Sequence, residues 1–157
     1  MKLKSILLLI FVVSTQMVIL PWIMIEYNDN LGLPTFKISI LQYFGIVLII
    51  LGFVVIGYCK RIFRIVGKGT PVPIEPPKEF VACGLYKFAR NPMYISYIVI
   101  YIGFFFISGC LLMFIFTLLC IPLIHFAVVH FEEPSLKKRF GDTYLGYKKK
   151  VKRLGLI

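Results

Sequence analysis

The sequence predicts an all-α integral membrane protein, and three observations carry that prediction. Hydrophobic residues make up 59% of the 157 positions, more than the roughly one half that is usual in soluble domains. They gather in long blocks without a formal charge, over residues 5–25, 38–59 and 91–131. The charged residues lie between and after these blocks. Such a pattern is typical of membrane-spanning helices rather than of one water-facing core.

The blocks predict about four transmembrane helices. Blocks 5–25 and 38–59 each match the ~20 residues that a helix needs to cross the bilayer core. Block 91–131 is about twice as long, and a division near Ser108-Gly109 would give a short third helix and a full-length fourth. The first block is too long for the apolar part of a signal peptide, so we expect it to be retained.

The order of the blocks predicts two regions. Residues 1–60 would form an N-terminal pair of transmembrane helices. Residues 61–157 would hold a cytoplasmic loop, a transmembrane hairpin and a C-terminal amphipathic helix. The loop is rich in proline over 67–84, which excludes a regular helix there, and we expect it to be ordered over a site. After Glu133, apolar residues recur at helical spacing, with Gly141 as the expected point of interruption.

Charge placement predicts the orientation of these spans. The net charge is +11, and most basic residues lie in the 59–90 loop or after Phe131. The loop between the first two spans holds Glu26, Asp29 and only Lys37. Basic loops stay in the cytoplasm, so both termini are expected there. This placement does not suit a nucleic-acid-binding face. The cysteines and histidines show no zinc-site spacing, so no metal is expected.

The segment Arg90-Asn91-Pro92-Met93-Tyr94 is the first candidate site. Proline suits the first turn of a helix, so the third span is expected to begin at Pro92. The free N–H groups at that helix start, together with Arg90, would suit a carboxylate on a small ligand. The alternative is that Arg90 is only a positive-inside anchor and Tyr94 only an interfacial aromatic residue.

Glu132 and Glu133, at the end of the last apolar block, form the second candidate site. A carboxylate gains nothing from the dipole at a helix C-terminus, and an ionisable residue near membrane depth is by default a functional candidate. We therefore expect a ligand group, such as a ribose hydroxyl or an ammonium, as partner. The alternative is a salt bridge to Arg90 or to the basic tail. His125 precedes Glu132 by seven residues and is expected on the same helix face.

If block 91–131 enters the bilayer and returns, both motifs lie on one membrane face and can build a single site. Such a site would offer a cation, a helix N-terminus, a carboxylate and the aromatic faces of Tyr86, Tyr94 and Phe80. These groups suit a ligand with complementary groups. S-adenosylmethionine offers a carboxylate, an ammonium, a ribose and a flat base, plus a sulfonium that aromatic faces stabilise. The residues make this ligand suitable without singling it out.

Further motif residues, Gly84-Leu85-Tyr86, Pro134-Ser135-Leu136, Phe140-Gly141, Tyr144 and Tyr147, extend the pattern. With them, residues 67–153 resemble the integral-membrane methyltransferases, which include isoprenylcysteine carboxyl methyltransferase and the phospholipid N-methyltransferases. The resemblance implies S-adenosylmethionine as methyl donor, bound on the cytoplasmic side. It also implies a set of cofactor-binding residues: Lys78, Phe80, Val81, Tyr86, Asn91, Pro92, Met93, Tyr94 and Glu132.

The expected reaction is in-line methyl transfer to a lipid or prenyl-type acceptor that enters from the bilayer. Arg90, His125 and Glu133 are the expected catalytic residues. An amine acceptor must first lose a proton, which His125 or Glu133 could take, whereas a carboxylate acceptor needs no base. The isoprenylcysteine enzymes usually have histidine at the position of Asn91 and arginine at that of Val128, and both departures weigh against a prenylcysteine substrate.

Two other interpretations stay open at this point. One is a methyltransferase of a small hydrophobic metabolite. The other is a non-catalytic small membrane protein, such as an assembly factor or a transporter, which would be expected to carry polar residues inside a span. The apolar blocks hold few of these: Gln16, Gln42, His125 and scattered hydroxyls. The acceptor and the oligomeric state are not predicted.

Overall fold

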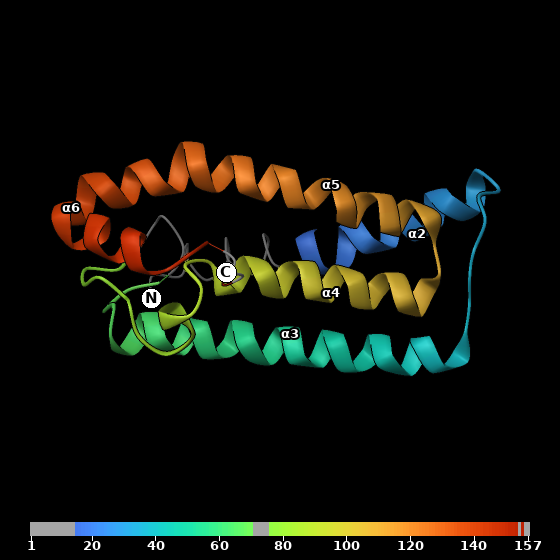
Figure 1. The fold of residues 1–157 in the computed structure, drawn as a ribbon. Helices are drawn as coiled ribbons and strands as arrows, with labels where there is room; N and C mark the ends of the chain where they lie inside the picture. Colours follow the sequence, from blue (N-terminus) through green and yellow to red (C-terminus); the bar gives the residue numbers. More distant parts are fainter. Residues whose placement is uncertain (1–14, 71–75, 154, 156–157) are drawn as a thin grey trace. The chain divides into compact units, whose positions relative to one another are not determined.

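The computed structural model describes residues 15–70, 76–153 and 155. In these ranges every regular element is a helix (Figure 1). An antiparallel bridge between Thr35 and Cys110 is isolated and belongs to no strand. The all-α prediction is therefore confirmed for the described part of the chain.

The elements follow the predicted blocks. Gly109 has φ +65°, and a Cβ there would collide with the carbonyl of Phe36, so glycine is required at the predicted division. The start of a helix at Pro92 is also confirmed. In chain order the elements are the π-helical turn η1 (Thr15–Ile19), α2 (Leu20–Asn30), α3 (Ser39–Ile65), the 3-10 turn η2 (Gly84–Lys87), α4 (Pro92–Ser108), α5 (Leu111–Ala127), the π-helical turn η3 (Val128–Glu132) and α6 (Glu133–Lys150).

Two helices in the described residues are long and apolar enough to cross a membrane. One is α3, and the other begins at Leu111 and runs on through η3. The apolar helix α4 is shorter, with 17 residues. The predicted first span, 5–25, lies partly outside the described residues, and α2 covers only its end. The count of four spans stays a prediction.

The chain divides into two compact units. The first consists of the described residues up to Phe53 together with Tyr97–Cys120. In this unit α3 and α4 approach closely at two glycines, because a Cβ on Gly45 would lie 2.6 Å from the carbonyl oxygen of Gly103. Small residues permit such backbone contact between membrane helices. The predicted boundary at residue 60 divides the chain into two consecutive regions, whereas each of these units combines two separate segments. That boundary stays a prediction.

A buried side chain organises the connections of the first unit. Asn28 of α2 donates through Nδ2 to the carbonyl of Leu33 at 3.1 Å. Its Oδ1 accepts the backbone N–H of Leu112 at 3.2 Å. The second bond satisfies one of the N–H groups that a helix leaves free in its first turn. Asn28 therefore caps α5 from another helix.

The second unit, Val54–Ser96 and Ile121–Ile157, holds both motifs. Its main feature is a reversal inside α6 at Gly141, which has φ 51° and ψ −127° (Figure 1). In a straight helix Lys148 would lie about 22 Å along the axis from Glu133. Its Nζ is instead 2.6 Å from Glu133 Oε2. The predicted interruption at Gly141 is confirmed, and it turns residues 142–150 back on residues 133–140.

The expectation that Glu132 and Glu133 end a helix is wrong. The helix continues from α5 through η3 into α6, and the N–H of Glu133 donates to the carbonyl of Val128. Pro134 has no N–H for the carbonyl of His130, and a π-turn is one local adjustment that accommodates such a proline. The helix-dipole argument for a ligand at Glu132 therefore does not apply.

Candidate functional site

The two motifs meet in the second unit. Arg90 Nη1 donates to Glu133 Oε1 at 3.0 Å, across 43 positions of sequence. Tyr94, in the first turn of α4, is hydrogen-bonded to Glu132. The segment that opens α4 therefore contacts both glutamates.

Glu133 binds three cations. Its Oε1 accepts from Arg90 Nη1 and from Arg153 Nε, the latter at 2.6 Å, and its Oε2 accepts from Lys148 Nζ at 2.6 Å. Burial alone would raise the pKa of Glu133, but the hydrogen bonds from Arg153 and Lys148 and the charge of Arg90 outweigh it and lower the pKa to about 2. The salt-bridge alternative therefore describes this residue.

The low pKa has two consequences. Because the folded protein holds the proton more weakly than the unfolded chain does, the cluster stabilises the fold at neutral pH, and this stability is lost as the pH falls toward about 2. A carboxylate with such a pKa is also a weak base near neutral pH. Its contacts give Glu133 an ionic, organising role and argue against its predicted role as proton acceptor.

Glu132 is in a different environment. Its side chain is partly buried and hydrogen-bonded to Tyr94. Among the described residues, the buried side-chain polar atoms without a partner are Glu132 Oε2 and Arg90 Nε. Buried polar atoms normally have a partner. One free acceptor and one free donor therefore lie on residues of the two motifs.

Gly84-Leu85-Tyr86 fastens the loop to α3. Gly84 has φ +59°, and a Cβ there would lie 2.5 Å from the Tyr58 hydroxyl, so only glycine fits. Tyr86 is buried, hydrogen-bonded to Cys59, and its ring centroid is 5.5 Å from that of Phe63. The predicted cofactor-binding side chains that pack in this hydrophobic cluster are Val81, Tyr86 and Met93. Their side chains pack in the core of this unit and hold the loop and the start of α4 against α3.

Phe80 fastens the other end of the loop to α6. Its ring centroid lies 5.2 Å from those of Phe140 and Tyr147 and 6.1 Å from that of Tyr144. The Tyr147 hydroxyl donates to the carbonyl of Tyr86 at 2.6 Å. The described end of the predicted loop is therefore ordered against α6, whereas its residues 71–75 lie outside the described residues.

The remaining predicted residues lie at different depths. Lys78 is exposed and its backbone N–H donates to Gly67. Asn91 and Pro92 are buried at the start of α4, where the Asn91 N–H donates to the carbonyl of Arg153 at 3.2 Å. His125 is exposed, and its Nε2 lies 3.4 Å from Arg153 Nη1. His125 thus contacts Arg153, not Glu132.

Sequence reasoning did not predict Lys148, Arg153 or Tyr144 as members of this cluster. Tyr144 accepts from Arg90 Nη1 at 3.4 Å. The basic tail indicated the two cations and the motif included Tyr144, but the partner of each residue depends on the reversal at Gly141.

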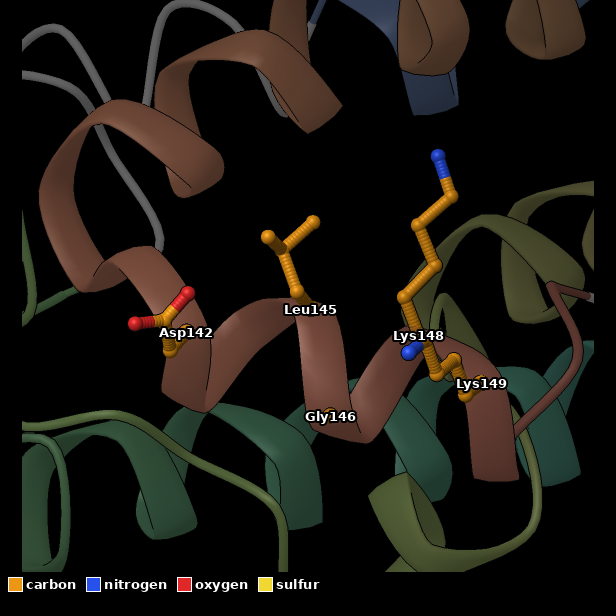
Figure 2. A pocket seen from close by; sticks show the side chains of 5 residues that line it. All are labelled: Asp142, Leu145, Gly146, Lys148 and Lys149. Atoms are coloured by element: carbon orange, nitrogen blue, oxygen red, sulfur yellow. The ribbon is translucent and has the colours of Figure 1, made fainter.

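A hollow lies beside the returning part of α6. Its volume is about 640 Å³, within the range of small-molecule sites, and it is lined by Asp142, Leu145, Gly146, Lys148 and Lys149. Figure 2 shows these residues along one stretch of the helix. Lys148 connects the hollow to Glu133 through its ion pair.

The family model described as phospholipid methyltransferase matches residues 40–143, which are 104 of the 157 residues. The chain belongs to the phospholipid methyltransferase family. The match includes α3 from its second residue, the loop, the segment 90–94, the two glutamates and the reversal at Gly141. No curated protein and no solved structure matches the chain. The family and the two long apolar helices indicate a membrane-associated methyltransferase of the phospholipid or isoprenylcysteine type.

Proposed function

We propose that this family member transfers a methyl group from S-adenosylmethionine to a lipid acceptor at the cytoplasmic face of a membrane. The observation that carries the proposal is the pair of buried, unpartnered atoms, Glu132 Oε2 and Arg90 Nε, on the two motifs that meet. A ligand with both a donor and an acceptor would satisfy them. The family supports methyl transfer as the chemistry.

The residues present fit this cofactor. Arg90 Nε and the start of α4 suit its carboxylate. Glu132 suits its ribose hydroxyls or its ammonium. The rings around Phe80, with Tyr94, offer aromatic faces for the base and the sulfonium. When bound, the cofactor supplies an electrophilic methyl group.

The protein residues then act mainly by positioning. Holding donor and acceptor in line removes much of the entropic cost of a reaction between two molecules. Arg90, fixed by Glu133 and Tyr144, orients the site. An amine acceptor must lose a proton. His125 suits this step better than Glu133 does, because Glu133 is held as an anion by three cations.

The acceptor that we propose is the amine of a phospholipid headgroup. The family model describes phospholipid methyltransferases. Asn91 and Val128 also depart from the pattern of the prenylcysteine enzymes, which argues in the same direction. The lipid would enter from the bilayer along α5, whose Leu119, Leu123 and Phe126 are exposed and apolar.

The test is calorimetric titration of the detergent-purified protein with S-adenosylmethionine, together with its thermal unfolding. A ligand of the native state raises the unfolding temperature by mass action. We expect binding and a raised temperature, and weaker binding of methylthioadenosine, which lacks the carboxylate and the ammonium. Incubation with a labelled methyl donor and phospholipid vesicles should label the lipid. An unfolding curve unmoved by saturating cofactor would refute the proposal.

A further inference from the structure

The chain beyond α6 folds back on the first motif. At Val151 the backbone becomes extended, with φ −121° and ψ 128°. The N–H of Arg90 then donates to the carbonyl of Lys152 at 3.0 Å, and that of Asn91 to the carbonyl of Arg153 at 3.2 Å. These two bonds fix the tail against the segment that opens α4.

Gly155 continues this contact. It has φ +69°, and a Cβ there would lie 3.1 Å from the carbonyl oxygen of Phe88 and 3.3 Å from Ala89 Cβ. Glycine therefore permits the close approach of the tail to residues 88–89. Two backbone hydrogen bonds and this close contact fasten the tail, so the side chain of Arg153 is held in a defined place.

The Arg153 side chain joins separate elements. Its Nε donates to Glu133 Oε1 at 2.6 Å, and its Nη1 lies 3.4 Å from His125 Nε2. The same Oε1 also accepts from Arg90. Arg153 and Arg90 therefore share one oxygen, and the position of Arg153 affects how closely Glu133 holds Arg90.

We propose that Arg153 is a positioning residue of the methyl-transfer site, which acts through Glu133 on Arg90 and through a direct contact on His125. This proposal rests on the proposed function. Removing Arg153 leaves Glu133 with Arg90 and Lys148, so no unpaired buried charge results and the variant should fold. Lysine at this position keeps the charge but lacks the fork that contacts both partners.

Three variants test the proposal: Arg153→Ala, Arg153→Lys and, as control, Lys152→Ala. Lys152 is exposed and uses its backbone carbonyl, which the control keeps. Affinity for S-adenosylmethionine and unfolding temperature without ligand are measured on the same preparations. We expect about tenfold weaker affinity for Arg153→Ala, because Arg90 is then less well placed for the one charge-assisted hydrogen bond that it would make to the cofactor. We expect a smaller loss for Arg153→Lys and wild-type affinity for the control.

The outcomes separate the two proposals. If the wild type does not bind the cofactor, the proposed function fails, and this inference with it. If the wild type binds and Arg153→Ala binds equally well, only this inference is overturned, including when its unfolding temperature falls. Should Arg153→Ala not be obtainable in folded form, wild-type affinity in Arg153→Lys would overturn the inference in its place.

Discussion

Two adjacent glutamates have different surroundings in this molecule. Glu133 is saturated by three cations, whereas Glu132 keeps one buried oxygen without a partner. A buried carboxylate with several charge-assisted bonds is tied to the fold, since removing it leaves cations unpaired. A buried carboxylate with a free oxygen is better suited to a ligand. We therefore propose a stabilising role for Glu133 and a ligand-binding role for Glu132.

Glu132→Gln should weaken cofactor binding while the fold survives. The amide oxygen can still accept from Tyr94, but a charge-assisted bond to the ligand is lost. We expect a loss of about 1.5–3 kcal/mol, roughly ten- to a hundredfold in affinity, measured by calorimetry. Unchanged affinity would remove Glu132 from the site.

Glu133→Gln is the matched control for this prediction. It leaves the guanidinium of Arg90, whose side chain is 10% exposed, without its carboxylate. Breaking a buried pair from one side costs about 3–5 kcal/mol, so the unfolding temperature should fall clearly. If Glu132→Gln destabilised the protein more than Glu133→Gln did, the assignment of the two roles would be reversed.

At the scale of elements, the reversal of α6 assembles the cluster. Gly141 has φ 51° and ψ −127°, a region that only glycine adopts without strain. Apart from its chain neighbours and the backbone of its own helix, no atom lies within 4 Å of a Cβ placed on Gly141. The glycine is therefore required for its backbone conformation rather than for space. Neither neighbour of Gly141 in the helix has a positive φ. The backbone dihedrals of this one residue therefore turn the helix back and bring Lys148 to Glu133.

Gly141→Ala should therefore destabilise the protein by about 1–3 kcal/mol through backbone strain alone. The control is Gly146→Ala, also with open space around the Cβ but without a positive φ. In a helix interior, alanine is favoured over glycine by roughly 0.5–1 kcal/mol, so the control should be neutral or stabilised. Thermal unfolding of both variants in one detergent measures the difference, and equal effects would contradict the account of the reversal.

At the scale of the whole molecule, charge placement predicts which face of the membrane carries the site. The basic residues gather in the 59–90 loop and after Phe131, and positive loops stay in the cytoplasm. The proposed site draws its residues from both regions. A cytoplasmic site is therefore a consequence of this orientation, and the orientation can be tested independently of activity.

Cysteine labelling in intact cells tests the orientation. In a variant without native cysteines, a membrane-impermeant reagent should label a cysteine at Asn30 and should not label one at Glu79, both exposed positions. Permeabilised cells, in which both positions should react, are the control. Labelling at Glu79 but not at Asn30 would place the loop outside the cell and move the proposed site to the other face.

The sequence by itself determined where the long apolar helices lie and where several of them begin or break, because length, proline and glycine act locally. Long apolar blocks predicted α3 and α5, Pro92 predicted the start of α4, and Gly109 and Gly141 predicted the breaks. Each of these signals works through a few neighbouring residues. The motifs also sufficed to indicate the family.

Only the tertiary structure decided which charges meet. The bonds of Glu133 to Arg90, Lys148 and Arg153 span 43, 15 and 20 positions, and they depend on the direction that the chain takes after Gly141. The π-turn at Val128–Glu132, which carries the helix past the glutamates, was likewise not apparent from apolar spacing. A sequence pattern shows that a helix breaks, but the direction of the chain after the break is set by the packing of distant segments.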